Sequence, residues 1–222
     1  MTTTSTEDAN TVRVLRGLAH DDPSVRLRAA LAVGTNPDPG FVDGLVERCA
    51  VEPDFPVREM LTWALTRHPA AVAVPPLLEE VRSERAQARS QALHTLSKIG
   101  DPLAWPAVTP ALLSDPDEEV ARSAWRAAVV LAPEDERPAL AVGLATQFGR
   151  GGREAQLSLS RALVALGEAA APVLTAATAD PDPRVRAHAL ATEALRRDPD
   201  AGFESAIEEA KRIAVLGTDR EG

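Results

Sequence analysis

The chain has 222 residues, a formal net charge of −9 at pH 7 and few aromatic side chains. An acidic chain of this kind is poorly suited to binding nucleic acid or an anionic membrane surface through bulk charge. Alanine supplies much of the apolar content, and small side chains allow helices to approach closely. The composition therefore favours an all-α stack over a fold built around a large aromatic core.

Nothing in the sequence indicates export or membrane insertion. The first residues, MTTTSTEDAN, lack the basic and apolar regions of a secretory signal. No stretch approaches the roughly 18 apolar residues that a membrane span needs. Cys49 is the sole cysteine, so no intramolecular disulfide can form. We therefore expect a cytoplasmic protein.

Taken in chain order, the sequence predicts one helical domain with a short segment at each end. Residues 1–10 are polar and Thr-rich and are expected to be a flexible lead-in, with the first helix starting at Thr11. The domain covers residues 11–212, and residues 213–222 are expected to be a flexible tail. The charged stretch Pro199–Lys211 suits a polar helix that caps the end of the domain.

A repeated helix pattern organises the domain. The stretch Ala88–Pro102 predicts an amphipathic helix that stops at Gly100 and turns at Asp101 and Pro102. Comparable helices recur about 32, 31, 32, 35 and 30 residues apart, which is the spacing of helical solenoids. Their opening apolar residues, counted here as position one of each second helix, are Val25, Val57, Ala88, Val120, Ala155 and Val185.

Further columns keep the same period. Three residues before position one the chain has Asp22, Asp54, Arg85, Asp117, Gly152 and Asp182, mostly good helix N-caps. One residue after position one it has Arg26, Arg58, Arg89, Ala121, Gln156 and Arg186. We interpret this Asp/Arg ladder as capping and repeat-to-repeat packing. Prolines suited to a first turn are expected to open the first helices, at Pro75, Pro106, Pro138 and Pro172.

The longest step between repeats contains additional residues. They fall at Gln147–Arg153, QFGRGGR, whose glycines and arginines predict a flexible basic loop within repeat five.

The pattern D-x-x-V-R-x-x-A-x-x-A-L followed by G-D-P-x-A-x-P resembles HEAT repeats of the short bacterial kind first noted in phycobilisome lyases. It is seen, with variation, at Asp22–Gly34, Asp54–Leu65, Ala88–Pro106, Asp117–Leu131 and Asp182–Leu195. The resemblance covers roughly Thr11 to Lys211. It implies an all-α fold: a right-handed α-solenoid of about six antiparallel helix pairs plus a C-terminal capping helix. It also implies first helices outside, second helices lining a concave face, and protein binding more often than catalysis.

On that architecture, positions three and seven of each second helix face the concave side, one turn apart. Position three reads Leu27, Glu59, Ser90, Arg122, Leu157 and Ala187, and position seven reads Leu31, Trp63, His94, Arg126, Arg161 and Ala191. Tryptophan and arginine are frequent anchors of protein interfaces. We expect a groove for a protein partner or peptide segment that has an apolar anchor and an acidic stretch. The candidate binding residues are Glu59, Trp63, His94, Arg122, Arg126 and Arg161.

A plainer interpretation stands beside this one. Trp63 could be packed between repeats, and the arginines could form an ordinary solvated face. Trp105 and Trp125 are expected to be packing residues, and Cys49 a small buried hydrophobe.

Catalytic and metal-binding motifs are not evident. His20, His68, His94 and His188 fall in different repeats without a metal-binding spacing, so we expect no metal and no cofactor. Deoxyhypusine hydroxylase, a HEAT-like enzyme, binds iron through His-Glu dipeptides, and this chain has none.

The enzymatic alternative is a HEAT-like alkylpurine DNA glycosylase, in which Glu59 and Trp63 would lie in an aromatic-lined groove. No Asp follows Trp63 or Trp125 at helical spacing, where the chain has Arg67 and Val129. The prediction is therefore a non-catalytic scaffold or adaptor, with neither nucleic acid nor membrane as its expected partner. It would be monomeric or weakly self-associating through Leu27 and Leu31.

Overall fold

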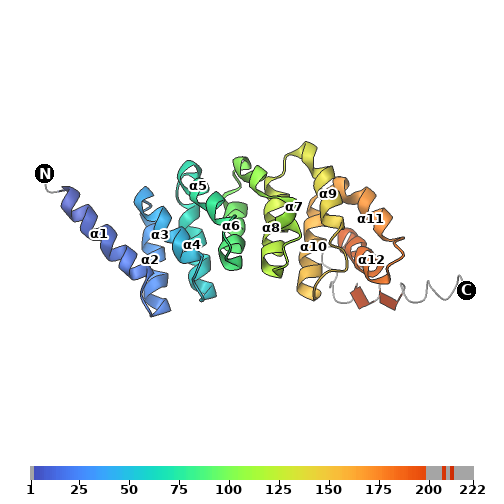
Figure 1. Ribbon diagram of the computed structural model, residues 1–222, viewed down its shortest axis with the longest axis horizontal. Helices are drawn as coiled ribbons and strands as arrows, with labels where there is room; N and C mark the ends of the chain where they lie inside the picture. The colour runs from blue at the N-terminus through green and yellow to red at the C-terminus, as the bar shows by residue number, and fades with distance from the viewer. Residues whose placement is uncertain (1–2, 199–206, 209–210, 213–222) are drawn as a thin grey trace, which may run out of the picture. The chain divides into compact units, whose positions relative to one another are not determined.

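The computed structural model describes residues 3–198, 207–208 and 211–212, and the described residues form helices and turns. The α-helices follow one another in six pairs (Figure 1). The pairs are α1 (Thr3–Leu18) with α2 (Pro23–Thr35), α3 (Val42–Cys49) with α4 (Phe55–Thr66), α5 (Ala70–Glu80) with α6 (Ala86–Ile99), α7 (Pro110–Leu113) with α8 (Glu118–Leu131), α9 (Arg137–Ala145) with α10 (Arg153–Ala165), and α11 (Ala171–Ala177) with α12 (Pro183–Arg197). Short 3-10 helices are η1 (Pro39–Phe41), η2 (Pro102–Ala107), η3 (Glu134–Glu136) and η4 (Gly167–Ala170).

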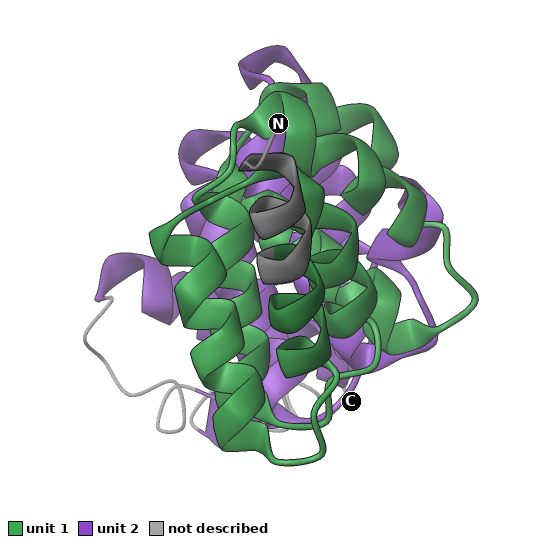
Figure 2. Cartoon of the chain, turned by 90° about the vertical axis from the view of Figure 1, so that its left-hand side faces the viewer, with its two compact units in different colours: residues 1–107 green, residues 108–222 purple. Residues whose placement is uncertain are grey.

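The chain divides into two compact units, residues 1–107 and 108–222 (Figure 2). In unit 1 the second helices α2, α4 and α6 pack in series, and the first helices α1, α3 and α5 form the other layer. Unit 2 has the same construction, with α8, α10 and α12 in one layer and α7, α9 and α11 in the other. Each unit is an α-solenoid, which confirms the predicted all-α fold. The right-handed sense of the solenoid and the single domain over residues 11–212 stay predictions.

Helix α1 begins at Thr3 and so includes residues that were assigned to a lead-in. The predicted tail, 213–222, lies outside the described residues, and so does most of the predicted capping helix. Within that stretch, Ile207 is buried and belongs to a cluster with Ala187, Ala191 and Leu195 of α12.

The predicted core positions are buried throughout the four inner repeats. Positions one, five, eight and nine point into the space between the helix layers, and alanine at many of them lets neighbouring helices approach closely. These buried residues are Val57, Leu61, Ala64 and Leu65; Ala88, Ala92, Thr95 and Leu96; Val120, Ala124, Ala127 and Ala128; and Ala155, Leu159, Ala162 and Leu163.

The aspartates of the ladder cap the second helices, as predicted. The side chains of Asp22, Asp54, Asp117 and Asp182 accept hydrogen bonds from backbone N–H groups in the first turn of α2, α4, α8 and α12. These N–H groups have no partner within the helix, so each cap removes an unsatisfied donor.

The arginines of the ladder close loops within their own repeats, and Arg26 also bonds to Glu52 of the next repeat. In four repeats Nη1 of the arginine donates to the carbonyl oxygens five and six residues earlier, at 2.6–3.4 Å. Each guanidinium therefore closes the loop between the two helices of its own repeat. We call this contact the arginine clamp; its members are Arg26, Arg58, Arg89 and Arg186.

The proline column is correct for repeats five and six only. Pro138 and Pro172 lie in the first turn of α9 and α11. Pro75 instead lies inside α5, which begins at Ala70, and Pro106 lies inside η2. Pro75 has no N–H to donate to the carbonyl of Ala71, four residues earlier in the helix. Both residues are exposed, so water can bind to that carbonyl.

Candidate protein-interaction surface

The structure brings three predicted site residues together in unit 1. Glu59 and Trp63 lie one turn apart on α4, and His94 lies on the adjacent helix α6. His94 Nε2 is 3.3 Å from Glu59 Oε1, so a polar contact joins the two helices at this face. Leu31, on α2, is 45% exposed.

Trp63 both packs and remains accessible. Its ring lies directly over Gly34 of α2, where an added Cβ would come within 2.2 Å of the indole Cζ3. At the same time 39% of the Trp63 surface is exposed. Packing between repeats and availability to a partner are therefore both properties of this residue.

The three predicted arginines lie in unit 2, on the packed helices α8 and α10. Arg122 pairs with Glu119 at 2.9 Å and approaches Glu154 of α10 at 4.0 Å, so much of its charge is balanced locally. Arg126 and Arg161 are exposed. Of the three, these two are the better placed to attract an acidic ligand.

Other positions of the predicted face are not accessible. Ser90 is buried in α6. Ala187 and Ala191 are buried with Ile207, and Leu157 packs against the same cluster. In unit 2 the accessible residues of the predicted face are therefore those of α8 and α10 that carry the arginines.

Sequence reasoning missed a buried ionic network in unit 1. Glu52, in the loop before α4, is fully buried and accepts two hydrogen bonds from Arg26, both at 2.7 Å. Arg48 Nε and the backbone N–H of Asp54 donate to the same carboxylate. Burial alone would raise the pKa of Glu52, but the two arginines outweigh it and lower the pKa from 4.5 to about 2. Its place just before an N-cap gave no signal of burial.

A second missed network lies in unit 2 around His188. This imidazole is fully buried: Nδ1 accepts from the Gly149 N–H at 3.1 Å, and Nε2 lies 2.9 Å from the Gln156 carbonyl oxygen. Ser160 Oγ is 3.0 Å from the same Nε2. Burial lowers the pKa of His188 from 6.5 to about 4. A neutral ring that accepts at Nδ1 and donates at Nε2 satisfies these contacts.

The His188 network holds the loop Gln147–Arg153, which corrects the expectation of a flexible basic segment. Phe148 is buried edge-on against the His188 ring, with the ring centroids 5.0 Å apart. Gly149 is buried with φ of 75°, a left-handed conformation that favours glycine, and its carbonyl accepts from Arg184.

Arg150 completes this loop by replacing a missing clamp. Repeat four has Ala121 where repeats one, two, three and six have the clamp arginine. Arg150 donates to the carbonyl of Asp115, which lies six residues before Ala121. Arg150 of the inserted loop therefore supplies from repeat five the contact that repeat four cannot make for itself.

Cys49 and Trp125 are structural, as predicted. Cys49 is buried, and burial raises the pKa of its thiol to about 12, so it is not a nucleophile at neutral pH. Trp125 is fully buried, and its Nε1 donates to the Leu113 carbonyl.

No group of three or more His, Cys, Asp or Glu side chains is placed to hold a metal ion within the described part of the chain. Among those same residues, no single helix is long and apolar enough to cross a membrane. One helix pair, Arg153–Ala165 with Gly167–Ala177, has the length and composition but is bent by 119°.

Residues 42–131, from α3 to the end of α8, match the family model of HEAT repeats. No curated protein matches the chain.

Among solved structures, the chain is similar to the complex of CpcE and CpcF of phycocyanin lyase from Nostoc sp. PCC7120, with 20% identity over 96% of this chain and 88% of that chain and a TM-score of 0.49. It is also similar to human deoxyhypusine hydroxylase, with 20% identity over 98% and 99% and a TM-score of 0.47. An engineered protein matches with 18% identity over 90% and 97% and a TM-score of 0.46.

Proposed function

We propose that this chain is a non-catalytic scaffold or adaptor that binds a protein segment on the inner faces of its second helices. The match of residues 42–131 to the family model of HEAT repeats supports this proposal. The observation that carries the proposal is the exposed face of Trp63. Tryptophan is usually well buried, yet Trp63 keeps more than a third of its surface accessible beside Leu31 and the Glu59–His94 contact. An accessible tryptophan held firmly by Gly34 is a preorganised anchor for an apolar side chain.

Two exposed arginines of unit 2 suggest an acidic ligand. Arg126 and Arg161 are exposed on packed helices in a protein whose net charge is −9. Exposed guanidinium groups bind carboxylates through paired hydrogen bonds. The proposed ligands are therefore an apolar side chain for unit 1 and an acidic stretch for unit 2.

Selection of peptides from a phage-displayed library on the full chain tests this proposal. Peptides that bind unit 1 should carry a large apolar residue, and peptides that bind unit 2 should carry aspartate or glutamate. Trp63→Ala should weaken binding of those peptides by more than about tenfold, as expected for an interface anchor. The double variant Arg126→Glu/Arg161→Glu should remove the preference for acidic residues.

Two controls separate binding from folding. Trp63→Phe keeps an aromatic ring over Gly34 and should retain part of the affinity. Arg196→Glu/Arg197→Glu reverses two exposed arginines of α12 that lie outside the proposed surface and should change nothing. Peptides that bind every variant equally, in chains with unchanged circular dichroism, would exclude the inner faces. Salt-dependent binding to duplex DNA would favour a nucleic-acid ligand instead.

A further inference from the structure

Unit 1 has a second surface, on its first helices, that the proposed function does not use. A cavity of about 430 Å³ opens between α1 and α3, and its lining includes Leu15, Leu18, Asp43, Gly44, Glu47 and Val51. Figure 1 shows α1 leaning away from α3 towards its N-terminal end. The two helices meet closely at Gly44, where an added Cβ would lie 2.6 Å from Leu15 Cδ2. We call this cavity and its rim the α1/α3 groove.

The floor of the groove is apolar and continues beyond the part that α3 covers. Leu15 and Leu18 lie in the groove, and Val12 is one turn earlier on the same side of α1. Val12 and Val51 are 47% and 46% exposed, unlike the valines of the helical core. Apolar residues one turn apart on an uncovered helix mark a face that fits another helix.

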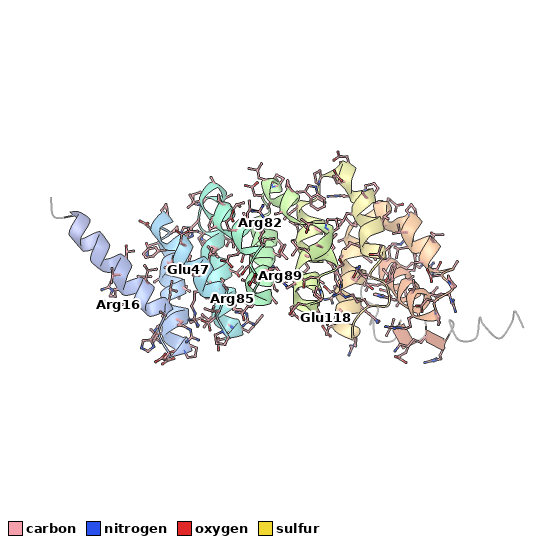
Figure 3. All side chains as sticks on the ribbon, viewed as in Figure 1. Arg16, Glu47, Arg82, Arg85, Arg89 and Glu118 are labelled. Atoms are coloured by element: carbon pink, nitrogen blue, oxygen red, sulfur yellow. The ribbon has the colours of Figure 1, made fainter. Side chains whose placement is uncertain are left out.

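The charges at the groove have opposite signs on its two helices. The α3 side carries the exposed carboxylates Asp43 and Glu47. The α1 side carries the exposed Arg16, one residue after Leu15 (Figure 3). Arg48 does not offset the acidic rim, because its guanidinium is paired with the buried Glu52 at 2.7 Å.

A surface that is basic on one helix and acidic on the next is complementary to itself. Under two-fold symmetry, contacts are reciprocal, so each α1 can lie in the groove of the other copy. In that arrangement the arginine of one α1 meets the acidic rim of the other α3, and the exposed valines cover each other. We propose that the α1/α3 groove binds α1 of a second copy of this chain and forms a symmetric dimer, with Arg16 of each copy paired with Glu47 of the other.

A charge-reversal cycle on the full chain tests the pairing, with dissociation constants measured by sedimentation equilibrium. The wild type should dimerise reversibly. Arg16→Glu and Glu47→Arg should each raise the dimer dissociation constant by at least about tenfold, because each introduces two like-charge contacts per dimer. The double variant Arg16→Glu/Glu47→Arg restores opposite charges and should recover most of the affinity.

Arg82→Glu is the matched control, since Arg82 is an exposed arginine of unit 1 outside the groove, and it should leave the dimer unchanged. A wild type that stays monomeric at high concentration would overturn the proposal and leave the groove to a different partner. If the Arg16 and Glu47 variants leave the dissociation constant unchanged but Leu31→Asp abolishes the dimer, the α1/α3 pairing is wrong. The dimer would then form through the inner face of the second helices. Because the groove lies on the first helices, failure here leaves the proposed inner-face function untouched.

Discussion

At the scale of single residues, Glu52 shows how a buried carboxylate depends on its partners. It is enclosed by Arg26 and Arg48, and its oxygens accept from both guanidinium groups and from a backbone N–H. Removing one member of a buried ion pair leaves the other charge without compensation. The network therefore links the loop before α4 to α2 and α3, and the loss of any one of the three charged side chains leaves a buried charge without one of its partners.

We predict that Glu52→Gln lowers the free energy of unfolding by about 3–5 kcal/mol at pH 7, because it strands the buried Arg26 charge. Since the folded pKa of Glu52 is about 2 and the ordinary value is 4.5, the carboxylate stabilises the fold above pH 4.5. That contribution is lost as pH falls towards 2, so the difference between wild type and variant should shrink over this range. Urea titration at several pH values measures it. Glu79→Gln, in an exposed pair with Arg82, should have little effect at any pH.

His188 is the counterpart in unit 2, and its pH dependence has a different window. Its pKa is about 4 when folded and 6.5 ordinarily, so the unfolded chain takes up the proton first. Stability is fully present above pH 6.5 and declines as pH falls to 4, by roughly 3 kcal/mol in total at about 1.4 kcal/mol per unit of pKa difference. His188→Gln should flatten that decline in urea titrations followed by fluorescence of the buried Trp125. His20→Gln, at an exposed histidine, should leave the slope intact.

At the scale of elements, the loop Gln147–Arg153 joins repeats four and five. The Arg150 guanidinium donates to the backbone carbonyl of Asp115, and the Gly149 N–H donates to Nδ1 of His188 on α12. A segment rich in glycine and arginine is thus fixed by contacts to residues more than thirty positions away. The glycines permit the left-handed turns, and the arginine satisfies a carbonyl acceptor.

Arg150→Ala should destabilise unit 2 by about 1.5–3 kcal/mol, the usual range for a lost hydrogen bond from a charged donor. The loss should appear first in the loop between α7 and α8, because the Asp115 carbonyl loses its guanidinium partner. Hydrogen exchange resolved at Asp115–Asp117 would detect faster opening there. Arg197→Ala removes an arginine whose side chain is 77% exposed and should leave this exchange unchanged. Equal protection in both variants would show that the loop does not depend on the contact.

The same elements show how far sequence reasoning reaches. Helix pairing, aspartate caps and core positions recur every 30–35 residues, so the sequence alone assigns their residues. Glu52, His188 and Arg150 act through partners 26 to 39 positions away, and no periodic signal marks such pairs. Trp63 was ambiguous for a physical reason, since the glycine that receives its ring is in the preceding repeat and carries no side chain to reveal the contact.

At the scale of the whole molecule, the two units differ in the groups that make them sensitive to acid. Unit 1 contains the Glu52 network, which weakens below pH 4.5, and unit 2 contains the His188 network, which weakens below pH 6.5. We predict that residues 108–198 lose protection from hydrogen exchange at a higher pH than residues 11–107 during acid titration. Mass spectrometry of peptides from each unit would measure the order. Simultaneous loss would show that the two units open together and that neither network sets the transition.

The arginine clamp bears on how such a chain can be lengthened or rebuilt. Where the guanidinium closes the loop of its own repeat, a gene segment encoding that helix pair also encodes the contact that holds its loop. Repeats two, three and six, with Arg58, Arg89 and Arg186, have this property. Repeats four and five do not, because Arg150 of one secures the loop of the other. A recombination point between them would separate Arg150 from the Asp115 carbonyl that it binds. These two repeats should therefore be inherited, and engineered, together.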